Sequence, residues 1–124
     1  MAQRQTRQRT AIRTAIDEAA RPLSPEEVLD AAKPSVPSLS IATVYRALRS
    51  LQESGFIRPV AIPDQPPRYE RAGLDHHHHF FCRECDRVFD VPGCPSNVEN
   101  LAPKGFTVDG HDIVLFGTCR GCDA

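Results

Sequence analysis

Residues 75–85 read Asp-His-His-His-His-Phe-Phe-Cys-Arg-Glu-Cys, so four consecutive histidines run into a Cys-x-x-Cys pair. A second such pair, Cys119 and Cys122, follows Cys82 and Cys85 after 33 intervening residues. Each pair can present two thiolates from one tight turn, and two pairs complete the tetrahedral four-sulfur site that zinc fills in structural centres. Redox-active pairs, the alternative, normally open a helix in a thioredoxin-like pattern, which this sequence lacks. The spacing therefore predicts a structural zinc site in the C-terminal part of the chain.

The histidine run predicts further metal ligands. In an extended segment, period-two alternation places His77 and His79 on one face and His76 and His78 on the other. Two separate centres follow, one adding Glu70 and Asp90 to the first pair and one adding His111 and Glu99 to the second. Mixed imidazole and carboxylate ligands suit exchangeable Fe(II), Mn(II) or Zn(II). The alternative is a solvated polyhistidine turn, and Cys94, which has no partner spacing, is expected to be a spare thiol.

The charge of the chain is divided along its 124 residues, although the net charge is only −1. Residues 1–58 hold nine basic and six acidic side chains, whereas residues 59–124 hold six basic and ten acidic ones and all of the Cys and His. The first half therefore suits a polyanionic partner. Its first arginines form either a solvated basic tail or an arm that contacts phosphates. No long apolar run or signal pattern occurs, so we expect a cytoplasmic protein without a membrane span.

Three short helices are predicted in the first half. Apolar residues at helical spacing predict a helix over 10–20, stopped by Arg21-Pro22. Ser24, followed by proline and two glutamates, begins a second helix that runs to about Ala32. Ser40 caps a third helix, which ends at Gly55, a residue suited to the left-handed position after a helix.

The third helix indicates DNA binding. Val44, Leu48 and Leu51, with Ile41 before them, form an apolar stripe, while polar side chains that can contact bases or phosphates lie on the other faces: Thr43, Tyr45, Arg46 and Arg49. Two short strands, over 56–62 and 68–70, follow and are joined by a proline-rich turn. Three helices and a strand pair predict a winged helix whose last helix enters the major groove. The alternative is a three-helix unit with a solvated polar face.

These segments together resemble the Fur (ferric uptake regulator) family of metal-dependent bacterial repressors over nearly the whole chain. The matching stretches are Thr6-Arg7-Gln8-Arg9, residues 42–48, residues 75–85, Gly105-Phe106, His111 and residues 116–122. The resemblance implies an α+β chain, with a winged-helix DNA-binding domain and hinge over 1–72 and a small α/β dimerisation domain with a four-cysteine zinc site over 73–124. It also implies a homodimer that binds a double-stranded palindromic operator when its regulatory metal is bound, and no enzymatic activity.

By position, the resemblance assigns roles to individual residues. It makes the four paired cysteines ligands of structural zinc: Cys82, Cys85, Cys119 and Cys122. It makes four further residues the regulatory site: Glu70, His77, His79 and Asp90. A second metal site falls on His76, His78 and His111, and Glu99 joins it if two residues are inserted after Asp90. Tyr45 and Arg46 match the family's DNA-contacting pair, and Arg7, Arg9, Thr43 and Arg49 are further candidate DNA contacts.

Three departures from the family concern its metal ligands and its dimer interface. The region between the first two helices has no histidine ligand, Ala72 stands where zinc sensors often have a cysteine, and residues 92–103 are shorter than the usual dimerisation helix. Asp64 is a candidate for the missing first-domain ligand. The absent cysteine favours Fe(II) or Mn(II), with zinc as runner-up. A peroxide sensor that oxidises His77 or His79 is a further alternative.

Two other classes of protein fit the sequence less well. A zinc hydrolase or deaminase would need a general base beside its histidines, and the chain has no His-x-Glu or His-Glu-x-x-His motif. A metal buffer or chaperone would bind metal without needing Arg46 and Arg49.

Overall fold

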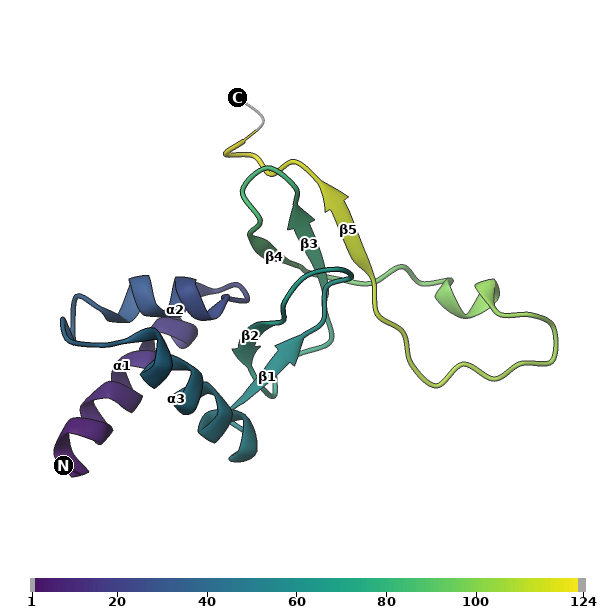
Figure 1. Cartoon of the computed structure of the whole chain (residues 1–124). Coiled ribbons are helices and arrows are strands. Elements are labelled where there is room, and N and C mark those ends of the chain that lie inside the picture. Colours follow the sequence, from purple (N-terminus) through teal and green to yellow (C-terminus); the bar gives the residue numbers. More distant parts are fainter. Residues whose placement is uncertain (1, 123–124) are drawn as a thin grey trace. The chain divides into compact units, whose positions relative to one another are not determined.

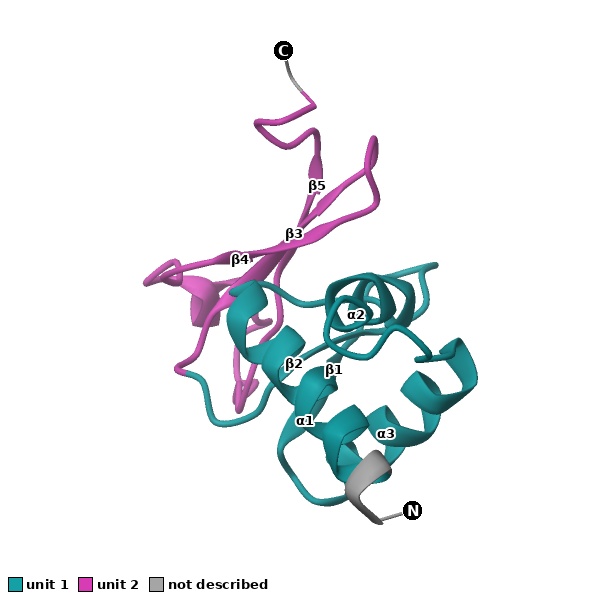
Figure 2. Cartoon of the chain, turned by 90° about the vertical axis from the view of Figure 1, so that its left-hand side faces the viewer, with its two compact units in different colours: residues 1–74 teal, residues 75–124 magenta. Residues whose placement is uncertain are grey.

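The computed structural model describes residues 2–122, with side chains from residue 5 onward. The chain forms two compact units, residues 1–74 and 75–124, which Figure 2 shows in teal and magenta. The boundary lies two residues beyond the position expected from the sequence. None of the described helices is both long and apolar enough to cross a membrane.

The first unit is a winged helix. Three helices, α1 (Ala2–Ala19), α2 (Pro25–Ala32) and α3 (Ile41–Glu53), are followed by the antiparallel strands β1 (Ile57–Val60) and β2 (Arg68–Arg71) (Figure 1). Pro59 lies within β1, which is tolerated because a two-stranded sheet has only edge strands. The predicted order of elements is thus confirmed.

One prediction for this unit was wrong: α1 begins at Ala2, not at Thr10. Apolar periodicity detects only the buried half of a helix, here the turns that carry Ile12 and Ile16. The preceding residues are mostly Gln and Arg, good helix formers that continue the helix without a buried face. Arg9 also ties this part to α3, because its guanidinium donates to the Ser50 hydroxyl at 2.6 Å. The basic stretch, expected as either a solvated tail or an arm that contacts phosphates, is therefore part of a helix.

The core of the first unit gathers the apolar faces of the three helices. Its members that are at least 95 % buried include Ile12, Ile16, Val28, Val44, Leu48 and Leu51. The stripe on α3 is confirmed except at Ile41, which is 37 % exposed because it is the first residue of the helix. Tyr45 is 47 % exposed, so α3 leaves its polar face outside the core of this unit.

A capping box fixes the start of α2 at the position that the sequence around Ser24 predicts. The Ser24 hydroxyl accepts from the Glu27 backbone N–H at 3.1 Å, and the Glu27 carboxylate accepts from the Ser24 backbone N–H at 3.0 Å. Arg21 donates to the same carboxylate at 2.6 Å. Burial raises the pKa of Glu27, but these Arg21 and Ser24 contacts outweigh it and hold the pKa below its ordinary value.

The second unit is a three-stranded sheet of order β4–β3–β5. The central strand β3 (His78–Cys82) pairs antiparallel with β4 (Val88–Val91) and parallel with β5 (Val114–Gly117). A parallel neighbour requires a long crossover, and residues 92–113 supply it with one short 3-10 helix, η1 (Val98–Leu101). The buried apolar residues of this unit are few, namely Phe81, Cys82 and Val88 among those described. So small a core needs support beyond apolar burial.

Replacing Glu27 by Gln tests the capping box. The folded pKa of Glu27 is lowered, so its carboxylate stabilises the first unit above the unfolded pKa, and this contribution is lost as the pH falls through the folded pKa. We expect Glu27→Gln to lower the free energy of unfolding by about 1 kcal/mol at neutral pH. Chemical denaturation at a series of pH values measures this.

The control is Glu26→Gln, which removes a neighbouring exposed carboxylate. The Glu27→Gln deficit should shrink in acid, and the control should change little at any pH. A deficit that persists unchanged in acid would contradict the role given to the Glu27 charge.

Candidate metal centres

The four paired cysteines meet at one end of the second unit. Cys82 ends β3, Cys85 lies in the turn before β4, and Cys119 and Cys122 form the turn after β5. Their sulfur atoms all lie within 4.8 Å of one another, and Cys85 and Cys119 are 3.8 Å apart. A tetrahedral zinc with Zn–S bonds of about 2.3 Å spaces its sulfurs by about 3.8 Å. The predicted four therefore come together in a geometry that fits zinc.

The electrostatics of this cluster call for a cation. Burial raises the pKa of Cys82, but backbone N–H donors from Cys85, Cys119 and Glu84 outweigh it and lower the pKa to about 6. The thiol of Cys122, crowded first of all by Cys119, has its pKa raised to about 12. The Cys82 thiol thus loses its proton readily, whereas the Cys122 thiol keeps its proton. A divalent ion lets all four act as thiolates.

A second group lies on one face of β3. Nε2 of His77 and of His79 lie 3.3 and 3.7 Å from one carboxylate oxygen of Asp90. The register explains this, because His79 pairs directly with Asp90 across β3 and β4. Nδ1 of His77 lies 2.7 Å from the Asp75 carbonyl, and a proton donated there leaves Nε2 free for a metal. Three predicted regulatory ligands are therefore adjacent within the second unit.

The other predicted regulatory ligands belong to the first unit. Glu70 lies on β2, where its carboxylate pairs with Arg58 at 2.6 Å. Asp64 is exposed in the turn between β1 and β2, with a left-handed φ of 63°.

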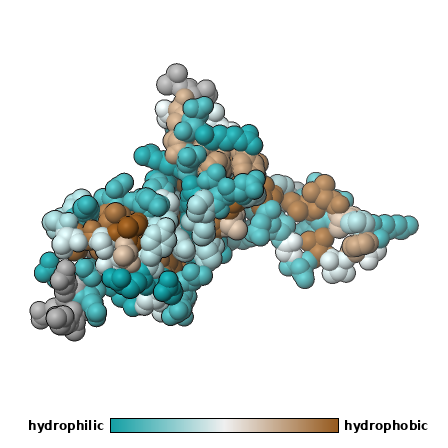
Figure 3. All heavy atoms as spheres, viewed as in Figure 1, coloured by the Kyte–Doolittle hydropathy of each residue, from teal (hydrophilic) through white to brown (hydrophobic). Residues whose placement is uncertain are grey.

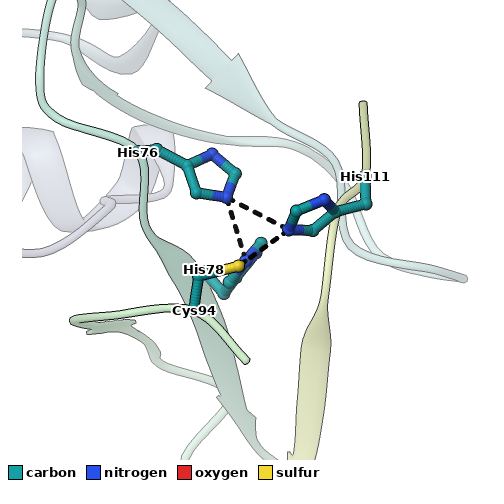
Figure 4. Close-up of side chains that lie close together, drawn as sticks. All are labelled: His76, His78, Cys94 and His111. Atoms are coloured by element: carbon teal, nitrogen blue, oxygen red, sulfur yellow. Dashed lines mark hydrogen bonds between the residues drawn. The ribbon is translucent and has the colours of Figure 1, made fainter. Parts of the chain in front are cut away.

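The third group contains the other two histidines of the run, His76 and His78 (Figure 4). His76, His78 and His111 come together as expected from the sequence, with the Nε2 of His76 3.1 Å from that of His78 and 3.2 Å from that of His111. Burial, and then the charges of His76 and His111, lower the pKa of His78, which favours its neutral, metal-binding form.

The fourth member of this group is Cys94, not Glu99. The Cys94 sulfur lies 2.9 Å from Nε2 of His111 and 3.3 Å from that of His78, whereas Glu99 is exposed on η1 and outside the group. Cys94 is therefore not the spare thiol expected from the sequence. The register explains this placement, because His78 pairs with Val91 and the turn Gly93-Cys94-Pro95 begins two residues later.

The candidate DNA-contacting residues do not all lie on one surface of the first unit. Thr43 and Arg46 of α3 and Arg9 of α1 line one open groove, in which Arg46 donates to the Thr43 hydroxyl at 3.1 Å. Tyr45 and Arg49 are exposed on α3. Arg7 lies apart from these residues and lines a depression between α1, α2 and the turn at 35–36.

A winged helix with an exposed polar face on its third helix, followed by a sheet that carries thiolate, imidazole and carboxylate clusters, defines the class of metal-dependent transcription regulators. Comparison with known proteins specifies the family. The model of the ferric uptake regulator family matches residues 1–116. The peroxide operon regulator of Bacillus subtilis is 33 % identical over 101 residues, which cover 78 % of this chain and 68 % of that protein. The chain belongs to the ferric uptake regulator family and is not an enzyme.

Solved structures agree with this assignment. The Helicobacter pylori ferric uptake regulator Fur, described as having three functional metal binding sites, aligns with a TM-score of 0.72 and 26 % identity over 94 % of this chain and 80 % of that one. FurB from M. tuberculosis, a zinc uptake regulator, is 31 % identical over 96 % of this chain and 95 % of that one, with a TM-score of 0.53. The α+β fold expected from the sequence is thereby confirmed.

Substitution of Cys82 tests the four-sulfur centre. We expect Cys82→Ser to weaken zinc retention at least about tenfold. A metal in this centre would compensate for the small core, so residues 75–122 of the variant should also lose hydrogen-exchange protection, while the core of α1–α3 keeps it. Metal analysis after dialysis and hydrogen exchange measure both effects.

Cys94→Ser is the matched control, since Cys94 lies outside the four-sulfur group. This control should retain the zinc of that group and the protection of the sheet. Loss of protection in the first unit instead of the second in Cys82→Ser would contradict the structural role.

Proposed function

We propose that this chain is a metal-responsive repressor that binds a palindromic operator as a homodimer when Fe(II) or Mn(II) occupies its regulatory site. The observation that carries the proposal is the convergence of His77, His79 and Asp90 in a chain whose other unit is a winged helix. Imidazole and carboxylate ligands bind such metals reversibly, as a sensor requires. Such a regulator would act in the cytoplasm.

DNA recognition is assigned to α3. Its apolar face is buried, which leaves Tyr45, Arg46 and Arg49 exposed to reach base edges and phosphates in a major groove. The groove shared with Arg9 places another guanidinium beside the first turns of α3. Two copies of α3 in a dimer would read half-sites about one helical turn, or a multiple, apart.

The regulatory metal is proposed to couple the two units. The family resemblance implies that Glu70 is the metal ligand from the hinge. It would bind the same metal ion as His77 and His79. A metal held by both units would favour one angle between them and so one spacing of the two α3 helices in a dimer. Its effect is limited by the difference between its affinities for the two arrangements.

Dimerisation is assigned to the second unit. The 92–113 segment carries Leu101, 85 % exposed, and Phe106, 71 % exposed. Figure 3 shows apolar side chains gathered on the segment that projects at the right. Exposed apolar surface of this kind suits burial against a second copy of the chain.

The sensed signal rests on the ligand set. Ala72 removes the hinge cysteine that would favour zinc, so Fe(II) or Mn(II) is preferred, with zinc as the runner-up. The similarity to FurB, a zinc uptake regulator, supports the runner-up, and that to the peroxide operon regulator supports peroxide sensing through His77 or His79. A metal buffer is the remaining alternative, and it would not need DNA-contacting arginines on α3.

A substitution in the regulatory site tests metal sensing. We expect His79→Ala to keep the fold and the four-sulfur zinc but to abolish the metal-dependent increase in DNA binding. Gel shifts with a selected operator, with and without added Mn(II), Fe(II) or Zn(II), provide the measurement. If the unmodified chain binds no DNA, or binds it equally well with and without every metal, the proposal that it is a metal-responsive repressor is rejected.

A substitution on α3 tests DNA reading. Arg46→Ala should weaken operator binding by about 1–3 kcal/mol, which is roughly five- to 150-fold, without changing metal affinity. Lys33→Ala, which removes the same charge at the end of α2, is the matched control and should bind nearly as tightly as the unmodified chain. Equal losses in both variants would show that total charge, and not the face of α3, governs binding.

A further inference from the structure

We propose that Cys94 is the fourth ligand of a third metal centre, with His76, His78 and His111, and that this centre selects zinc over Fe(II) and Mn(II). All four ligands of this centre belong to the second unit. The centre could therefore form whether or not the chain binds DNA and whether or not the regulatory site proposed above is correct. It also replaces Glu99, the carboxylate expected from the sequence, with a thiol.

The four candidate ligand atoms point into one space (Figure 4). Three are imidazole Nε2 atoms and the fourth is the Cys94 sulfur, and all lie within 4.8 Å of one another. The contacts run from His76 to His78 and His111 at 3.1 and 3.2 Å, and from Cys94 to the same two histidines at 3.3 and 2.9 Å. Each member therefore touches two others, as the corners of a coordination polyhedron do.

The size of this cluster suits a tetrahedral ion. Zinc with Zn–N bonds of about 2.0–2.1 Å and a Zn–S bond of about 2.3 Å separates its ligand atoms by about 3.3–3.6 Å. The four contacts given above are shorter than this, most of all that between Cys94 and His111, so an outward shift of the Cys94 turn and small movements of the imidazole rings would admit the ion. Cys94 is exposed and follows the end of β4, where such a shift meets little resistance.

The donor set determines the metal. Three imidazoles and one thiolate form a four-coordinate site of the kind that zinc fills, whereas Mn(II) prefers oxygen ligands and Fe(II) is typically held by two histidines and a carboxylate with open positions. The group at His77, His79 and Asp90 has a carboxylate and no sulfur. The two faces of the histidine run would thus prefer different metals, and zinc added in excess can bind at both.

The centre would also fasten the long crossover. Cys94 comes three residues after the end of β4, and His111 comes three residues before the start of β5. A metal between them and β3 would anchor both ends of the 92–113 segment to the sheet. The Leu101 and Phe106 side chains lie in the part of the chain enclosed in this way.

Metal binding at His78 would break one hydrogen bond of the structure. The Ile113 backbone N–H donates to Nδ1 of His78 at 3.2 Å. A neutral imidazole that binds metal through Nε2 carries its proton on Nδ1, so it no longer accepts from Ile113. Zinc binding should therefore speed hydrogen exchange at the Ile113 amide relative to its neighbours in β5.

Cobalt spectroscopy on the full chain tests the assignment. The four-sulfur centre is first filled with zinc, which resists displacement by cobalt. Co(II) is then added to the unmodified chain, to Cys94→Ser and to Glu99→Gln. A thiolate-to-cobalt charge-transfer band should appear in the unmodified chain and in Glu99→Gln, and it should be absent from Cys94→Ser. Competition with a chromophoric chelator should show zinc bound to this centre about ten- to a hundredfold more weakly in Cys94→Ser.

The Cys94→His variant distinguishes the effect of losing the sulfur atom from the effect of losing a fourth metal ligand. This variant restores a fourth ligand without sulfur, so it should recover most of the zinc affinity but show no charge-transfer band. Retention of the four-sulfur zinc shows that each variant is folded. A band that persists in Cys94→Ser, or zinc affinity that falls in Glu99→Gln but not in Cys94→Ser, would overturn the proposal.

Discussion

Successive residues of a β-strand point to opposite faces of its sheet, and this chain applies that rule to four histidines in a row. β3 and the residues before it send His77 and His79 toward Asp90, and His76 and His78 toward His111 and Cys94. The same strand then ends at Cys82, the first of the four sulfur ligands. A shift of one residue in the pairing of β3 would exchange the two faces and dismantle both histidine groups.

The two units depend on different stabilising interactions. The first has a continuous apolar core built on Ile12, Val28, Val44 and Leu48, and it can present α3 without help. The second buries few apolar side chains around three short strands, so metal bound to its ligands would also stabilise its fold. This difference suits a regulator in which the DNA-reading unit stays constant and the metal-binding unit responds.

The sequence predicted most of the fold because its signals are local. The capping residues Ser24 and Ser40 mark helix starts, and Gly55 marks an end by its left-handed φ of 80°. The start of α1 was missed, since a solvated helical turn has no apolar period. The histidine faces followed from alternation alone, but Cys94 depends on the path of the chain after β4, where glycine and proline leave no periodic signal. Glu99 was expected from resemblance, and the short crossover places it elsewhere.

The two histidine groups lie on opposite faces of one strand, which predicts two separate metal centres. Calorimetric zinc titration of His78→Ala, His79→Ala and the double variant, with the four-sulfur centre already filled, tests this prediction directly. Each single variant should lose one binding event and keep the other at unchanged affinity, so that the two losses add in the double variant. If either single substitution removes both events, the two faces of β3 do not hold independent sites, which would contradict the proposed separation of the two centres.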